Sequence, residues 1–160
     1  MIVSRAKADD LAAIMTLEAA GFEHAAWSRD SWAAELTAAD RQVLAYRDAD
    51  DLLVAVATMQ LVDDYADLLR VVVAPHRRGE GIARKLLVAS IHMAQARGAV
   101  RILLEVEQTN APALAVYARL GFSPIDVRRD YYGPGLNAIV MELPIEDLSY
   151  SPGTPLEVAS

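Results

Sequence analysis

One stretch, residues 70–94, constrains the fold of this chain more than any other. It reads RVVVAPHRRGEGIARKLLVASIHMA and opens with a β-branched run that ends at Pro75. A basic turn with Gly79 and Gly81 follows, and apolar residues then recur at helical spacing over residues 82–94. This order predicts a strand, a cationic turn and an amphipathic helix.

The turn and the start of that helix predict a site for phosphate. A helix N-terminus carries backbone N–H groups without intrahelical partners and about half a positive charge. Gly81 lets the backbone approach a ligand without an intervening Cβ. Cationic side chains stand close by in the sequence at Arg77, Arg78, Arg84 and Lys85. We therefore expect a ligand that carries a pyrophosphate.

Length and composition favour one domain over residues 1–145 and a flexible tail over residues 146–160. A chain of 160 residues fits the usual size of a single domain, ~100–200 residues. Because 54% of its residues are hydrophobic, it can bury a substantial core. The tail ends in SPGTPLEVAS, which is rich in turn-forming residues.

Several classes of protein are disfavoured. The chain has no cysteine, which excludes disulfides and thiol nucleophiles, and its three histidines lack metal-ligand spacing, so no metal is expected. The net charge of −7 disfavours a nucleic-acid partner and suits a cationic acceptor such as a basic peptide. A signal-peptide core and an apolar run of ~20 residues are both missing, so we expect a cytoplasmic protein without a membrane partner.

The remaining patterns predict strands between helices and hence a mixed α/β sheet with parallel pairing near its centre. One helix begins at Asp9 or Asp10 and closes near Gly21, and a second begins after Ser28 as its N-cap. The helix over residues 111–120 follows Asn110 as N-cap and precedes Gly121. The strands are expected at residues 2–5, 42–48, 52–62, 66–74, 101–107, 122–129 and 138–143.

Two blocks of sequence are similar to a known family. Residues 78–83, RGEGIA, match the R/Q-x-x-G-x-G/A signature of the GNAT acyl-CoA-dependent N-acetyltransferases, in the strand–turn–helix setting that this signature requires. Residues 103–132, LLEVEQTNAPALAVYARLGFSPIDVRRDYY, resemble a run of the RimI-type members, and Trp27-Ser28 resembles their P-W-S element. RimI-type enzymes acetylate the N-terminal alanine of the eighteenth protein of the small ribosomal subunit.

The resemblance implies the GNAT fold, a mixed sheet of about seven strands flanked by about four helices and splayed at the cofactor site. It implies acetyl-CoA as co-substrate and direct attack by the acceptor amine. The implied cofactor-binding residues are Val71, Val72, Val73, Arg78, Gly79, Glu80, Gly81, Ile82, Ala83, Arg84 and Asn110.

Glu105 and Tyr117 are the catalytic candidates by this resemblance. Glu105 lies in an apolar strand, where partial burial would raise its pKa towards that of a general base. The alternative is a strand-end glutamate that faces solvent or pairs with an arginine. The Tyr117 phenol can donate a proton to the departing thiolate, and the alternative is an amphipathic core tyrosine.

The acceptor side is less well defined. The resemblance places Trp27, Arg70, Tyr131 and Tyr132 at the acceptor, and the alternative for Trp27 is a residue of the core. The sequence departs from the RimI-type pattern at Ala26, Arg70 and Asn137. We expect a monomer or weak homodimer that acetylates a protein N-terminus, with a ribosomal protein as candidate partner. A small-molecule amine as acceptor, or a non-catalytic acyl-CoA-binding module, are the alternatives.

Overall fold

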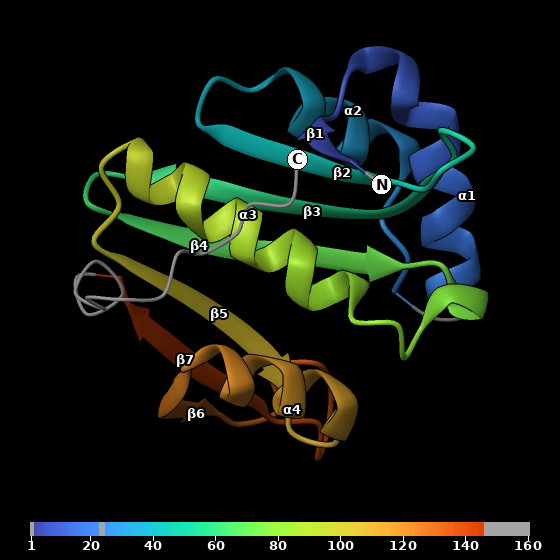
Figure 1. Ribbon diagram of the computed structural model, residues 1–160. Coiled ribbons are helices and arrows are strands. Elements are labelled where there is room, and N and C mark those ends of the chain that lie inside the picture. Colours follow the sequence, from blue (N-terminus) through green and yellow to red (C-terminus); the bar gives the residue numbers. More distant parts are fainter. Residues whose placement is uncertain (1, 23–24, 146–160) are drawn as a thin grey trace.

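The computed structural model describes residues 2–22 and 25–145, which contain one seven-stranded sheet (Figure 1). The strands are β1 (Ile2–Arg5), β2 (Arg41–Arg47), β3 (Leu53–Val62), β4 (Tyr65–Val73), β5 (Arg101–Glu107), β6 (Ser123–Arg128) and β7 (Ala138–Pro144). They lie in the order β1-β2-β3-β4-β5-β7-β6, and only β4 and β5 pair in parallel. The predicted mixed sheet is confirmed, while the predicted tail, residues 146–160, lies outside the described residues.

Helices cover both faces of this sheet (Figure 1). The α-helices of the described residues are α1 (Leu11–Gly21), α2 (Arg29–Thr37), α3 (Ile82–Ala96) and α4 (Ala111–Leu120), with short 3-10 turns at Ala8–Asp10 and Pro75–Arg77. α3 crosses β2, β3 and β4 and touches α4 on the same face, which we call the α3 face. α1 packs on β3 and β4 and α2 packs on β2 from the opposite side, the α1 face.

The core forms where the predicted apolar patterns meet. α3 buries the residues that its helical spacing selected, with Leu86 and Leu87 almost fully enclosed. Every second residue of β5 is buried as well, namely Ile102, Leu104 and Val106. Trp32 of α2 is completely buried. Apolar side chains at period 3.6 and period 2 thus meet between the α3 face and the central strands.

Local signals located several helix ends correctly. The Ser28 hydroxyl accepts a hydrogen bond from the Ser31 backbone N–H at 3.1 Å, so Ser28 caps α2 as predicted. Gly121 follows α4 with a φ of 100°, the left-handed conformation of a glycine C-cap. Asp10 precedes α1, but its carboxylate binds Lys7 and Arg47 instead of capping the helix.

Gly21 ends α1 without a left-handed cap, because Phe22 after it is extended. A Cβ on Gly21 would lie 3.0 Å from a methyl carbon of Val72. Since this is tighter than nine in ten real Cβ contacts, the glycine lets α1 approach β4 closely. The close approach brings the end of α1 to the central strands, where the site lies.

Candidate active site

β4 and β5 are paired along only part of their length. Their parallel ladder ends where Leu68 lies opposite Leu104. At the same point β4 contains an extra residue, Leu69, and its ladder with β3 shifts by one position. A bulge of this kind bends its strand and interrupts pairing. The sheet therefore opens between the ends of β4 and β5, which confirms the expected splay.

The bulge also decides which way the side chains of β4 point. Leu68 pairs with Met59 of β3, whereas Arg70 pairs with Thr58, the preceding residue of β3. Successive residues of β3 point to opposite faces, so Leu68 and Arg70 do so too, although they are two positions apart. Arg70 therefore points to the α1 face, and Val71 points to the α3 face.

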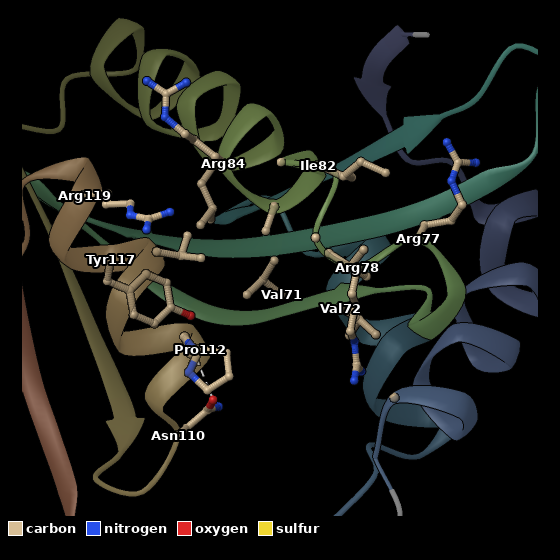
Figure 2. Close-up of a pocket in the computed structure, with 18 of the residues that line it drawn as sticks. Val71, Val72, Arg77, Arg78, Ile82, Arg84, Asn110, Pro112, Tyr117 and Arg119 are labelled. Carbon is tan, nitrogen blue, oxygen red and sulfur yellow. Dashed lines mark hydrogen bonds between the residues drawn. The ribbon is translucent and has the colours of Figure 1, made fainter.

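A cavity of about 560 Å³ lies on the α3 face of this opening (Figure 2). We call it the α3-face pocket. Its walls are the end of β4, the turn before α3 with the start of α3, and one side of α4. Eleven predicted site residues line it: Val71, Val72, Val73, Arg78, Gly79, Gly81, Ile82, Ala83, Arg84, Asn110 and Tyr117. Of the predicted cofactor-binding residues, only Glu80 lies outside this lining.

The turn before α3 has the geometry of an anion site. Gly79 and Gly81 have φ values of 81° and 77°, which glycine adopts without strain. No side chain of the described residues caps α3 at its N-terminus. The first N–H groups of this 15-residue helix are therefore free for a ligand beside the turn.

The cations around the turn divide into two groups. Arg77 forms ion pairs with Asp48 at 3.2 Å and with Glu80 at 2.8 Å. Arg77 lines the α3-face pocket as well, but two carboxylates already bind its guanidinium, so it is less available to a phosphate than Arg78 and Arg84 are. Arg78 and Arg84 line the pocket and form no ion pair within residues 2–22 and 25–145.

Arg119 of α4 is a further cation that sequence reasoning missed. It lines the α3-face pocket opposite the turn, and Figure 2 shows its side chain extending from α4 towards the α3 side. Its place two residues after Tyr117 on the same helix was the only signal in the sequence.

Tyr117 is both a packed residue and a pocket residue. Its ring makes an edge contact with Phe122 at a centroid distance of 5.8 Å. Figure 2 shows its hydroxyl directed into the α3-face pocket. Burial raises the pKa of Tyr117 to about 12, so the phenol keeps its proton at neutral pH. Tyr117 is thus a packed residue of the core, as one alternative predicted, and its hydroxyl lies where the predicted proton donor would have to lie.

Asn110 also combines two positions. Its side-chain oxygen accepts a hydrogen bond from the Ala113 backbone N–H at 3.2 Å, so its predicted role as the cap of α4 is confirmed. It lies at the rim of the α3-face pocket at the same time.

A second cavity, of about 550 Å³, lies on the α1 face of the sheet. We call it the α1-face pocket. It opens where α1 and α2 leave β5, β6 and β7 uncovered. All the predicted acceptor residues and the predicted base line it: Trp27, Arg70, Glu105, Tyr131 and Tyr132. The two cavities therefore approach the β4–β5 opening from opposite faces.

Glu105 is held by a cation within this pocket. Its carboxylate lies 3.0 Å from a guanidinium nitrogen of Arg128. The Arg128 guanidinium carbon in turn lies 5.4 Å from the ring centroid of Tyr131. Hydrogen bonding to Glu105 is the main cause that raises the pKa of Tyr131. Of the two neighbouring arginines, Arg128 is the one that faces the pocket, and Arg129 is not part of its lining.

Glu18 of α1 was not predicted, yet it organises one wall of the α1-face pocket. Its side chain is 0% exposed and forms an ion pair with Arg70. Its carboxylate also accepts the Trp27 backbone N–H at 2.8 Å and the Trp32 indole N–H at 3.2 Å. Trp27 thus lies in the pocket wall and Trp32 in the core behind it.

Arg70 therefore has partners of its own within the protein. Besides Glu18, it donates a hydrogen bond to the Ala25 carbonyl at 3.1 Å. Its guanidinium carbon lies 3.5 Å above the Phe22 ring centroid. Glu18 shares one helix face with Ile14, four positions earlier, and a carboxylate on an apolar face could have signalled this buried partner.

Asp67 is the other residue of this pocket that sequence reasoning missed. It lies on β4, one position before the last paired residue, and faces the α1-face pocket with Glu105. A carboxylate within the otherwise apolar run ADLLRVVVA was the available signal.

This fold and pair of pockets are those of an acetyltransferase. Residues 9–122 match the Acetyltransferase (GNAT) family, and the chain belongs to that family. It is accordingly an N-acetyltransferase, and it uses acetyl-CoA as acetyl donor.

Several similar proteins carry the name of a more specific activity. A [ribosomal protein bS18]-alanine N-acetyltransferase of Salmonella typhimurium is 41% identical over 100 residues, which cover 61% of this chain and 68% of that protein. The enzyme of the same name from Haemophilus ducreyi is 38% identical over 104 residues, covering 62% and 71%. The crystal structure of the ribosomal-protein-S18-alanine N-acetyltransferase from Escherichia coli superposes with a TM-score of 0.82 at 30% identity and covers 90% of this chain and 93% of that one.

Two features are absent from the described residues. No helix among them is long and apolar enough to cross a membrane. They also contain no group of three or more histidine, cysteine, aspartate or glutamate side chains that could hold a metal ion. His24, one of the three histidines, lies outside the described residues.

Proposed function

We propose that this chain transfers the acetyl group of acetyl-CoA to the α-amine at the N-terminus of a protein. The proposed acceptor is the N-terminal alanine of a ribosomal protein of the small subunit, acetylated in the cytoplasm. The observation that carries the proposal is the pair of cavities that meet at the β4–β5 opening, one lined by phosphate-binding groups and the other by carboxylates and aromatic rings. The two relatives and the superposed enzyme acetylate an alanine of such a protein, as their names state.

The α3-face pocket fits acetyl-CoA by its chemistry. Beyond the bulge, no strand of residues 2–22 and 25–145 pairs with the edge of β4 that faces the opening, so the backbone of Val71 to Val73 is available to bond an amide-bearing chain. The glycine turn and the start of α3, from Gly79 to Arg84, offer N–H groups to the pyrophosphate. Arg78 and Arg84 add positive charge, and Asn110 adds an amide at the rim.

The reaction then needs one proton removed and one supplied. Acetyl-CoA supplies a thioester whose carbonyl carbon receives the amine. Glu105 acts as general base at the acceptor amine, and Tyr117 donates the proton that the departing sulfur needs. The chain has no cysteine that could carry the acetyl group, so the amine attacks the thioester directly.

The α1-face pocket suits a cationic peptide end. Trp27, Tyr131 and Tyr132 supply flat faces around the carboxylates, and aromatic faces attract ammonium groups. Tyr131 and Tyr132 are 49% and 43% exposed, so both are accessible to a bound chain. The acidic protein as a whole, with net charge −7, favours the approach of a basic acceptor.

The test is a panel of acceptors offered to the purified protein with acetyl-CoA. It contains a peptide with the N-terminal sequence of the small-subunit protein, the same peptide with a blocked α-amine and a free lysine, and the small amines spermidine and lysine. We expect acetylation of the free α-amine alone, read by mass spectrometry. Faster acetylation of the small amines would overturn the proposal in favour of a metabolite acceptor. Tight binding of acetyl-CoA with no transfer to any amine would indicate a binding module.

A second experiment tests the acceptor in cells. Extracts of cells with and without this protein are compared by mass spectrometry of protein N-termini. We expect one or a few N-terminal alanines to lose their acetyl group without it. A change confined to small metabolites would contradict the proposal.

A further inference from the structure

The guanidinium of Arg70 lies at the junction of the two pockets. Arg70 comes directly after Leu69, the extra residue of β4, at a position where the sequence departs from the RimI-type pattern. The Phe22 ring, whose centroid is 3.5 Å from the guanidinium carbon, lines the α3-face pocket. The Trp27 ring, whose centroid is 5.2 Å from the same carbon, lines the α1-face pocket together with Arg70. A group bound to this guanidinium is therefore close to the place where donor and acceptor meet.

Two of the three nitrogens of this guanidinium are already bonded within the protein. Nε donates to the Glu18 carboxylate at 3.1 Å, and Nη2 donates to the same carboxylate and to the Ala25 carbonyl. Nη1 has no hydrogen-bond partner within residues 2–22 and 25–145. It is not buried either, because the only buried side-chain nitrogen or oxygen of those residues without a partner is Oε1 of Gln42. Arg70 thus offers the N–H groups of Nη1 to a ligand in the α1-face pocket.

Glu18 holds the guanidinium in a defined position. The side chain of Glu18 is 0% exposed and that of Arg70 only 16%. The Glu18 carboxylate also accepts the Trp27 backbone N–H, so the guanidinium and a wall of the α1-face pocket share one anchor. A planar guanidinium that is bonded along one edge has its remaining donors at a fixed angle, and a donor positioned in advance loses little entropy on binding. The paired carboxylate also offsets the positive charge of Arg70, so an ammonium group can bind nearby.

We propose that Arg70 binds the first carbonyl of the acceptor, through a hydrogen bond from Nη1 to the carbonyl oxygen of acceptor residue 1. This inference rests on the proposed function. Every protein N-terminus carries that oxygen close to its amine, whereas spermidine and similar amines have no carbonyl. A site that donates a hydrogen bond to its substrate disfavours an analogue without the accepting atom, because the donor is then left unpaired. Arg70 therefore favours a peptide N-terminus over a simple amine, and Glu18 is its positioning residue.

The first experiment uses the wild-type protein and changes the acceptor. The peptide with the N-terminal sequence of the small-subunit protein is compared with two analogues, in which the carbonyl of residue 1 or that of residue 3 is replaced by a thiocarbonyl. Because sulfur accepts hydrogen bonds more weakly than oxygen, we expect kcat/KM to fall about fivefold for the change at residue 1. The change at residue 3 is the control and should have no effect. Unchanged kcat/KM for both analogues, or an equal fall for both, would overturn the inference.

The second experiment changes the donor. Arg70→Lys keeps a positive charge beside Glu18 but has no second nitrogen for the acceptor. We expect kcat/KM for the peptide to fall about tenfold, mainly through a higher KM for the peptide, with KM for acetyl-CoA and kcat/KM for spermidine unchanged. The thiocarbonyl at residue 1 should then have no further effect, because the bond that it weakens is already absent. If the two changes lower kcat/KM independently, Arg70 does not bind that carbonyl.

Arg47→Lys is the matched control for this variant. Arg47 also forms an ion pair with a carboxylate, that of Asp10, its side chain is 21% exposed, and it lines neither pocket. It should leave kcat/KM unchanged for every acceptor. Thermal unfolding shows whether Arg70→Lys is folded under the assay conditions, and if it is not, the thiocarbonyl comparison in the wild type decides. An equal loss of kcat with the peptide and with spermidine would overturn the inference, because it would place Arg70 at the thioester.

The same data distinguish this inference from the proposed function. If the wild type acetylates spermidine faster than the peptide, the proposed function is wrong and the inference is wrong with it. If no amine is acetylated, the proposed function is wrong, and the same comparisons are made on Kd of the peptide for the protein bound to acetyl-CoA. If the wild type acetylates the peptide and neither the thiocarbonyl at residue 1 nor Arg70→Lys lowers kcat/KM, the proposed function stands and the role of Arg70 is refuted.

Discussion

The two pockets are built in different ways. The α3-face pocket takes most of its ligand-binding groups from one continuous segment, and many of these groups are backbone N–H and C=O groups of β4 and α3. The α1-face pocket takes side chains from β4, β5, β6, β7 and two connecting segments. A site made of backbone tolerates changes of sequence, whereas a site made of side chains changes with each substitution. We therefore expect the fold to determine the acetyl donor and individual residues to determine the acceptor.

Glu18→Ala should have the largest effect and should damage the α1-face pocket alone. It removes the buried partner of Arg70 and of the Trp32 indole, so we expect the free energy of unfolding to fall by about 3–5 kcal/mol. Urea unfolding followed by circular dichroism measures this loss. KM for the peptide should rise while KM for acetyl-CoA stays unchanged.

The control for this change is the double variant Glu18→Ala with Arg70→Met. Since the second substitution removes the unpaired guanidinium, part of the lost stability should return. If the double variant is less stable than Glu18→Ala alone, the ion pair is not the cause.

The buried phenol of Tyr117 in the α3-face pocket should make the free energy of unfolding depend on pH in the alkaline range. The pKa of folded Tyr117 is about 12, and a tyrosine of an unfolded chain has ~10. Below pH 10 neither state is ionised and the stability is fully present. Between pH ~10 and ~12 the unfolded state loses its proton first, so the free energy of unfolding falls by about 3 kcal/mol. Tyr117→Phe should lack this part of the decline, and identical curves for the two proteins would contradict the burial of the phenol.

The same variant tests the chemistry of the α3-face pocket. Tyr117→Phe keeps the ring beside Phe122 and removes only the hydroxyl, so folding at neutral pH should be unaffected. We expect kcat to fall about 100-fold with unchanged KM for acetyl-CoA, in a continuous assay of the free thiol. A kcat within about threefold of the wild type would mean that water supplies the proton.

Gly81→Ala should have the smallest effect. It should separate the binding of phosphate by the backbone N–H groups of the turn before α3 from the stability of the whole protein. Gly81 has a φ of 77°, and a side chain in that conformation costs about 1–2 kcal/mol. We expect this loss of stability together with a rise of about tenfold in KM for acetyl-CoA, because the turn amides are displaced.

Gly98→Ala is the matched control at the other end of α3. Gly98 has a φ of 100°, and neither glycine has an atom of the described residues within 4 Å of an added Cβ. Both variants should lose similar stability, but Gly98→Ala should leave KM for acetyl-CoA unchanged. An equal rise in KM for acetyl-CoA in both variants would show that lost stability causes the rise, and not displacement of the turn N–H groups.

The difference between the pockets also explains what the sequence could predict. A helix cap depends only on residues a few positions apart in the sequence. The sequence pattern therefore identified three caps correctly, at Ser28, Asn110 and Gly121. The strand–turn–helix over residues 70–94 is equally local, and its residues line one pocket together.

What sequence reasoning missed depends on contacts between distant residues. Glu18 and Arg70 are 52 positions apart, and no periodicity pairs them. Arg77 was expected beside the phosphate, but its ion pair with Asp48, which lies in a hairpin turn 29 positions earlier, was not predicted. Trp27 and Trp32 were indistinguishable in sequence, and only the course of the chain around Glu18 separates a wall residue from a core residue.

The extra residue in β4 has a consequence for how the sequence of this enzyme can vary. Because β4 contains Leu69 as an extra residue, the side chains of Asp67 and Arg70 point to one side of the sheet although they are three positions apart. The side chains of Val71 and Val73 point to the other side. A substitution at Leu69 does not change the number of residues in β4, so it leaves the bulge in place. Deletion of Leu69 would leave Leu68 opposite Met59 and Arg70 opposite Thr58, so the side chains would keep their sides, but the bulge that interrupts the pairing of β4 would be lost. Between these positions the number of residues is more constrained than their identity.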